Sequence, residues 1–367
     1  MRYAVAASAI LGAVAAAPQM INIEAALAVP TPTVLGPAIE ATKPAPVSYN
    51  PTVAASSVAE VVQSEGVIEK RDVPSACGTV LPGGTGPYPA SGTADSDYTA
   101  AGSSLRLKAQ QAVTPSGYDL SFQDQLGSSQ QIGYLTYKNL DSYDPSVCAQ
   151  ACDSEKFCLG FNIYFERDPK YDPQNGCANP PAVTNIKCSL YGYNVAQAAA
   201  TNQGQWRGPE DANGQAFHVV ITGSNGYSKQ SKPLPTVPDF QSPTSLPAAI
   251  NAPLDGTYDT YTGMRLFNDN PYDPSLCAAA CEAQTTYDVN HPAQDGSYKT
   301  CNFFNSYVLT KNDVPLGTYC SFYTRTWDSS YAVNTGYYYG DDVYKVRNSA
   351  SYVITNPTAP KMATTAP

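Results

Sequence analysis

The stretch YDPSLCAAAC, from Tyr272 to Cys281, is preceded in the chain by a near copy of itself, YDPSVCAQAC, from Tyr143 to Cys152. Each copy contains an Asp-Pro pair that is typical of a helix start. The aspartate suits the N-cap, and proline suits the first helical position because no N–H partner is lost there. The two cysteines of a copy stand four residues apart, so they share one helical face. Each copy therefore predicts a short helix that two disulfides attach to a neighbouring sheet.

Three further blocks follow each copy in the same order. CLGFNIY (158–164) matches CNFFNSY (301–307), CSLY (188–191) matches CSFY (320–323), and NQG (202–204) matches NTG (334–336). The segments between the blocks differ in length, which loops tolerate more easily than the framework that they join. We interpret the chain as an internal repeat whose blocks are the framework.

The blocks after each helix have the alternating pattern of short strands. Further strands are expected at 133–137 and 263–267, before the helices, and at 217–227 and 351–355, at the end of each copy. The expected fold class is α+β. It consists of two disulfide-bonded modules, each a short helix packed on a small antiparallel sheet, with a disordered N-terminal region and a Pro-rich linker.

The ten cysteines indicate disulfides rather than free thiols in an exported chain. Four cysteines in each copy allow three pairings, and a nested arrangement on the helix is the favoured one. It joins the first helical cysteine to the last strand and the second to the middle strand, and it leaves two cysteines to pair by elimination. The expected pairs are Cys148–Cys188, Cys152–Cys158, Cys277–Cys320, Cys281–Cys301 and Cys77–Cys177.

In this ordered set of motifs the chain resembles the PAN/apple module family, with a C-x3-C helix, a C-x-x-F-N-x-Y strand and a later strand cysteine. The resemblance covers about 220 of the 367 residues. The matching residues are Cys148, Cys152, Cys158, Phe161, Asn162, Tyr164 and Cys188, and then Cys277, Cys281, Cys301, Phe304, Asn305, Tyr307 and Cys320. Parts of the first copy also look like secreted proteins of filamentous fungi. The resemblance implies a module that binds proteins or carbohydrates without catalysis, although the extra terminal cysteines of some apple domains are lacking.

The N-terminus is typical of an export signal. Arg2 precedes an apolar run over 3–14, and small residues follow it. We expect a signal peptide over 1–17 and a secreted protein, extracellular or in the cell wall. No stretch approaches the roughly 20 apolar residues that a membrane span needs.

A propeptide is expected over 18–71. This segment is rich in Ala, Val, Pro, Ser and Thr and holds no cysteine, and it ends at the dibasic pair Lys70-Arg71. The pair predicts processing by a kexin-type protease. The expected organisation of the rest is a Gly/Ser/Pro-rich arm (72–116), the first module (117–228), a Pro-rich linker (229–252), the second module (253–355) and a tail (356–367).

Exposed aromatic residues are the best candidates for ligand binding. Trp206 lies near the NQG block, Trp327 precedes the NTG block, and Tyr337, Tyr338 and Tyr339 follow it. Such rings can stack on sugars or fill a small core. The net charge of −10 argues against nucleic acid. The expected function is therefore recognition of an extracellular glycan or protein, with no cofactor or metal and with the oligomeric state left open.

Two alternatives remain open. An acid-tolerant secreted hydrolase would need paired carboxylates or a histidine with a nucleophile, and Glu166, Asp168 and His218 are the residues to inspect. His291 is expected in a loop. The other alternative is a structural protein of the cell wall or matrix.

Overall fold

The computed structural model describes residues 20–38, 44–57, 77, 80–230 and 234–362. The expected signal peptide and the dibasic pair Lys70-Arg71 lie outside the described residues.

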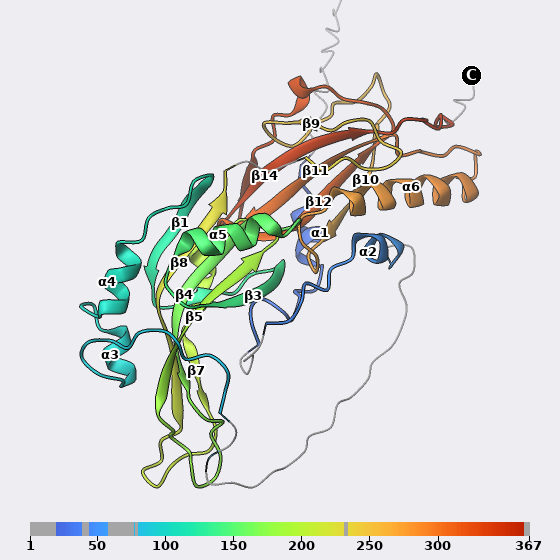
Figure 1. Cartoon of the computed structure of the whole chain (residues 1–367). Coiled ribbons are helices and arrows are strands. Elements are labelled where there is room, and N and C mark those ends of the chain that lie inside the picture. Colours follow the sequence, from blue (N-terminus) through green and yellow to red (C-terminus); the bar gives the residue numbers. More distant parts are fainter. Residues whose placement is uncertain (1–19, 39–43, 58–76, 78–79, 231–233, 363–367) are drawn as a thin grey trace, which may run out of the picture.

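Strands dominate the described part of the chain, and they form three antiparallel sheets (Figure 1). The first sheet has the order β1 (Tyr118–Gln125), β8 (Phe217–Lys229), β4 (Gly160–Pro169), β5 (Ala182–Tyr191) and β3 (Tyr134–Leu140), and β7 (Gly204–Arg207) also pairs with β8. The second sheet has the order β10 (Tyr261–Phe267), β12 (Val314–Tyr323), β11 (Phe303–Lys311), β14 (Asp342–Val353) and β13 (Gly336–Tyr339), and β9 (Thr244–Ser245) also pairs with β14. The third sheet joins β2 (Ser128–Ser129) to β6 (Ala200–Asn202).

The helices are few and mostly short. They are α1 (Ile23–Leu27), α2 (Pro51–Ser57), α3 (Asp95–Thr99), α4 (Ser104–Gln110), α5 (Pro145–Ser154) and α6 (Pro274–Asn290), with 3-10 turns η1 (Gln197–Ala199) and η2 (Ser329–Tyr331). None of the helices in the described ranges combines the length and the apolar character that crossing a membrane requires.

The helix starts agree with the repeated motif. Asp144 caps α5 by accepting the N–H of Ser146 at 2.8 Å, and Asp273 caps α6 by accepting the N–H of Ser275 at 2.9 Å. In both helices proline occupies the first turn. α5 packs on β4, and α6 packs on β11 and β12. α6 continues to Asn290, well beyond the short helix that the sequence predicts.

Five disulfides hold these elements together. They join Cys148 to Cys188, Cys152 to Cys158, Cys277 to Cys320, Cys281 to Cys301, and Cys77 to Cys177. These are the pairs that the nested arrangement predicts. The cysteines of α5 and α6 are fully buried in the clusters that those helices form with the sheets.

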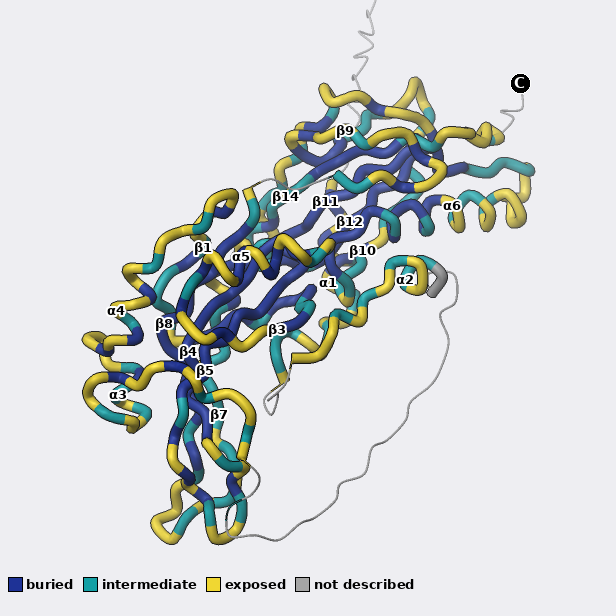
Figure 2. Tube along the Cα trace, in the orientation of Figure 1, coloured by how far each residue is buried: buried dark blue, intermediate teal, exposed yellow. Residues whose placement is uncertain are grey.

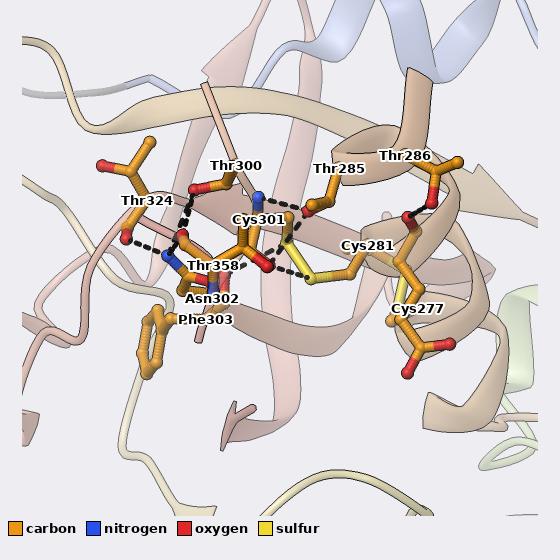
Figure 3. Close-up of a disulfide and its surroundings, with 12 residues drawn as sticks. Cys277, Cys281, Thr285, Thr286, Thr300, Cys301, Asn302, Phe303, Thr324 and Thr358 are labelled. Carbon is orange, nitrogen blue, oxygen red and sulfur yellow. Dashed lines mark hydrogen bonds between the residues drawn. A yellow bond between two sulfur atoms is a disulfide. The ribbon is translucent and has the colours of Figure 1, made fainter. Parts of the chain in front are cut away.

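Figure 3 shows how the second cysteine of α6 is attached. The disulfide from Cys281 reaches Cys301, whose N–H donates to Thr285 Oγ1 at 2.8 Å one turn further along α6. The next residue, Asn302, donates its amide N–H groups to the carbonyls of Thr324 and Thr358 at 2.9 and 2.8 Å. Helix, strand and C-terminal segment therefore meet at one buried junction.

The expected fold class is wrong in its main feature: the chain is not two small helix-on-sheet modules. It is mostly antiparallel β-sheet, with two sheets of six strands each. β4 and β5 each have ten residues and β8 has thirteen, so they extend past the helix that covers them. Strands outside the repeated blocks, such as β1 and β9, complete the sheets.

A small buried cluster also joins the two halves of the molecule. Ile132, Leu159 and Tyr193 of the first half pack with Tyr272 and Val308 of the second. The N–H of Tyr272 donates to the carbonyl of Gly192 at 3.1 Å. The two halves therefore touch through a small buried cluster, and each large sheet also has a core cluster of its own.

The expected disordered regions are likewise ordered where the structure describes them. In the N-terminal region, Ile21 and Ile23 are buried against the second sheet. In the Pro-rich stretch, Val237 and Phe240 are buried with α6, and Leu246 is buried nearby. Figure 2 shows both segments running against the buried strands. Their apolar residues have a sheet to pack on, and composition alone did not reveal it.

Candidate functional site

Two edge hairpins occupy equivalent places in the two sheets. β7 pairs with β8 after the turn Asn202-Gln203-Gly204, and β13 pairs with β14 after the turn Asn334-Thr335-Gly336. In each turn the asparagine Oδ1 accepts the glycine N–H at 3.1 Å. The matched blocks of sequence therefore form matched turns.

Each turn requires glycine for two reasons. The φ angles are +103° at Gly204 and +112° at Gly336, a region that other residues rarely adopt. A Cβ atom on either residue would lie 2.0 Å from a carbonyl oxygen of the neighbouring strand. The glycines let the edge strands start close to their partners and set the register of the residues that follow.

The register places an aromatic side chain at the equivalent position of each hairpin, and both are exposed. Trp206 stands opposite His218, and Tyr338 stands opposite Val343, each two residues after the glycine. Trp206 is 62% exposed and Tyr338 is 75% exposed. A single exposed ring needs no explanation, but here two such rings occupy equivalent positions on equivalent hairpins.

The indole of Trp206 is supported from one side by a histidine. The Trp206 and His218 rings stack with centroids 4.1 Å apart and an interplanar angle of 12°. His218 Nδ1 lies 2.8 Å from Asp95 Oδ2. This hydrogen bond lowers the pKa of Asp95, partly opposed by desolvation. The carboxylate orients the imidazole, and the imidazole packs on one face of the indole and holds it in place.

The two tyrosines beside Tyr338 are engaged by the N-terminal segment. The hydroxyl of Tyr337 donates to the carbonyl of Ile21. Tyr339 Oη lies 3.2 Å from Glu24 Oε1, and this hydrogen bond raises the pKa of Tyr339. Tyr337 is half-buried by this contact. Tyr339 remains exposed, as Tyr338 is.

Trp327 does not join the exposed aromatics. Only 5% of its surface is exposed, and it packs in a core cluster with Phe303 and Tyr323. Its indole N–H donates to Thr260 Oγ1 at 3.1 Å. Trp327 therefore fills the core and satisfies its polar atom.

The carboxylates considered for hydrolysis form a buried charged cluster. Glu166 pairs with Lys187, and Asp168 lies 4.0 Å from the same ammonium group. Asn185 donates to Asp168 at 2.6 Å. Burial raises the pKa of Glu166, with a further contribution from the charge of Asp168. Burial lowers the pKa of Lys187, but the two carboxylates outweigh it, so the net shift is upward. Glu166, Asp168 and Lys187 therefore form a buried polar cluster on β4 and β5.

The histidines have separate environments. His218 supports Trp206, whereas His291 stacks on Tyr287 at the end of α6, with ring centroids 4.3 Å apart. Within the described ranges, no group of three or more His, Cys, Asp or Glu residues is arranged to hold a metal ion.

A polar cleft of about 650 Å³ lies between the two large sheets. Its lining includes Gln125, Asn194 and Gln197 from the first half and Thr310, Asn312 and Arg347 from the second. Sequence reasoning did not find this cleft, because its residues come from separate segments and carry no shared motif.

No protein-family model, no curated protein and no solved structure matches this chain. The resemblance to PAN/apple modules stays a prediction.

Proposed function

We propose that the protein is an exported, non-catalytic recognition protein that binds carbohydrate at the cell wall or in the extracellular medium. The binding surfaces are the two edge hairpins, with Trp206 and Tyr338 as the stacking residues. The observation that carries the proposal is the equivalence of these residues: both follow an Asn-x-Gly turn on an edge strand, and both are largely exposed.

Carbohydrate is the favoured ligand class because of the chemistry at the hairpins. A sugar ring has an apolar C–H face bordered by hydroxyl groups, which matches an aromatic ring with polar neighbours. Gln205 and Arg207 flank Trp206, and Asp341 and Asp342 follow Tyr339. Arg207 is paired with Asp172 and Asp342 with Lys311, so the exposed Asp341, in the turn between β13 and β14, is the acceptor that a sugar hydroxyl can reach.

The strand orders support our interpretation of the chain as an internal repeat. The order β8-β4-β5-β3 in the first sheet corresponds to β14-β11-β12-β10 in the second, and β7 and β13 occupy matching edges. Two equivalent surfaces on one chain allow bivalent engagement of a polymer, which raises avidity without new contacts.

We assign no catalytic role to Glu166 and Asp168. Both carboxylates lie against the single ammonium group of Lys187, and Asp168 also accepts a hydrogen bond from Asn185. This arrangement is typical of a structural cluster inside a sheet. The five disulfides support export, because disulfides persist in oxidising compartments.

Retention on insoluble polysaccharides tests the proposal. We expect the full chain to be retained on at least one wall polysaccharide, such as chitin or β-glucan. Trp206→Ala and Tyr338→Ala should each weaken retention by up to about 100-fold through lost avidity, and the double variant should abolish it.

The matched control is Tyr287→Ala. Tyr287 is also an exposed aromatic residue, 60% exposed, but it lies on α6 away from both hairpins. Its loss should leave retention unchanged. Equal loss in all three variants, or retention of the double variant at the wild-type level, would rule out the hairpins as the binding surfaces.

A further inference from the structure

The N-terminal segment is seated on the aromatic face of the second sheet. Ile21 and Ile23 are buried among Tyr307, Tyr319 and Leu309, and α1 lies beside β10 and β12 (Figure 1). Ile21 lies just before the N-cap residue Asn22, and Ile23 is the first residue of α1. The contact therefore resembles a peptide with two apolar anchors in a binding site.

Polar contacts fix the main chain of this segment. The N–H of Asn22 donates to the hydroxyl of Tyr319 at 3.1 Å, and the carbonyl of Ile21 accepts the hydroxyl of Tyr337. Asn22 also caps α1 by accepting the N–H of Ala25 at 2.9 Å. Two tyrosine hydroxyls thus form hydrogen bonds with the main chain of the segment, while the isoleucines pack on the apolar surface of the sheet.

The segment continues from the second sheet to the first. The carbonyl of Leu35 accepts the N–H of Gln131 at 3.0 Å. Tyr49 donates its hydroxyl to Asp273 at 2.7 Å, and its ring meets the edge of Phe157 with centroids 4.8 Å apart. Both halves of the molecule therefore contact the described parts of this segment, residues 20–38 and 44–57.

No disulfide reaches this part of the chain. The first cysteine is Cys77, so residues 1–76 contain none. A cut of the main chain between residue 58 and residue 76 would leave the segment attached by non-covalent contacts alone. Hydrolysis after Arg71 would consume one water and leave a carboxylate on Arg71 and an amino group on Asp72.

We propose that the aromatic face of the second sheet is a peptide-binding site whose occupant is this chain's own N-terminal segment, and that the segment stays bound as a separate peptide after such a cut. The site takes a short peptide with two isoleucines two residues apart, followed by an acidic residue that reaches Tyr339. The product of processing is then a two-chain complex.

The test uses the full chain with a specific protease recognition sequence inserted between Arg71 and Asp72, so that cutting does not depend on natural processing. After the cut, size-exclusion chromatography under native conditions is followed by mass spectrometry of the peak. We expect the N-terminal fragment to co-elute with the body. In guanidinium chloride without reductant, the two should separate, because no disulfide joins them. Separation under native conditions would overturn the proposal.

Two matched variants test the anchors. Ile23→Asp should speed release of the fragment by about 10- to 150-fold. This range is the effect of losing the burial of one isoleucine side chain. Leu27→Asp is the control on the same helix, because Leu27 is 45% exposed and should change release little. Equal release rates for these two variants would contradict the proposed site.

A third variant covers the case in which Ile23→Asp fails to fold. Tyr337→Phe removes one hydroxyl without a change of volume and should speed release about 2- to 12-fold, the range for one hydrogen bond. An unchanged release rate would contradict the role of the hydroxyl. These experiments measure release of the fragment and do not measure polysaccharide retention. Their outcome is therefore independent of the carbohydrate-binding proposal.

Discussion

Gly336→Ala tests the link between turn geometry and the exposed aromatic surface. Gly336 begins β13 with φ +112°, and an added Cβ would lie 2.0 Å from the carbonyl oxygen of Tyr344 and 2.8 Å from the Cα of Lys345. Both atoms belong to the main chain of β14, so no side-chain rotation can relieve the overlap. The edge strand must move away from its neighbour.

The expected cost has two parts. The unfavourable backbone region costs about 1–3 kcal/mol for a non-glycine residue. Separation of the strands also loses hydrogen bonds between β13 and β14, at about 0.5–1.5 kcal/mol each. The loss of two such bonds brings the total to about 2–6 kcal/mol. This loss of stability is confined to the β13–β14 hairpin, because the disulfides and the core cluster of α6 lie elsewhere.

Hydrogen exchange followed by mass spectrometry measures this local effect. Amides of residues 336–346 should lose protection in Gly336→Ala, while α6 keeps its own. Polysaccharide retention should fall as it does for Tyr338→Ala. The control is Gly340→Ala, at φ +62° with no atom within 4 Å of the added Cβ. That variant should lose only about 1–2 kcal/mol. Equal protection and equal retention in the two glycine variants would refute the reasoning.

Two other predictions concern stability. Cys277 and Cys320 are 43 residues apart, and replacing both by alanine should cost about 4 kcal/mol of stability through loop entropy. The same change at Cys152 and Cys158, which are 6 residues apart, should cost about 2.4 kcal/mol. Urea unfolding measures both losses, and a larger loss for the shorter loop would contradict this explanation. Asp95→Asn should be less stable than the wild type above about pH 4, the ordinary pKa of aspartate, because the folded state lowers the pKa of Asp95. That difference should vanish as the pH falls through the lowered pKa, and an acid titration in which it grew would reverse the sign of the argument.

Local sequence signals were sufficient for the helix starts. Asp144 and Asp273 cap α5 and α6 as the Asp-Pro motif predicts, because an N-cap depends on residues within one turn. The cysteine spacing was equally informative, since two cysteines four apart on a helix must face the same sheet. The pairs that nesting predicts are the pairs in the structure.

The size of the sheets and the order of the flanking segments could not be read in the same way. The segment that carries Ile21 has a composition typical of a loose propeptide, and the stretch around Phe240 is rich in proline. Whether their apolar residues are buried depends on a surface formed by strands far away in the chain. Composition reports the number of apolar residues and not the presence of a partner surface.

The exposure of the candidate site residues could likewise not be predicted from the sequence. Trp206, Tyr338 and Trp327 are all aromatic residues in the sequence, and nothing local separates the exposed from the buried. The register of β7 on β8 and of β13 on β14 brings Trp206 and Tyr338 to the surface, while Trp327 falls into a cluster with Tyr323.

The sequence by itself predicted the helix caps and favoured the cysteine pairs that the structure contains, because both depend on residue types at short and regular spacing. Only the tertiary structure decided that the two halves form extended sheets in contact with each other, and that residues 20–38 and 44–57 lie across them. It also decided which rings are exposed. Burial is a property of surfaces that meet in space, and the residues that meet here, such as Ile23 and Tyr319, are hundreds of positions apart in the chain.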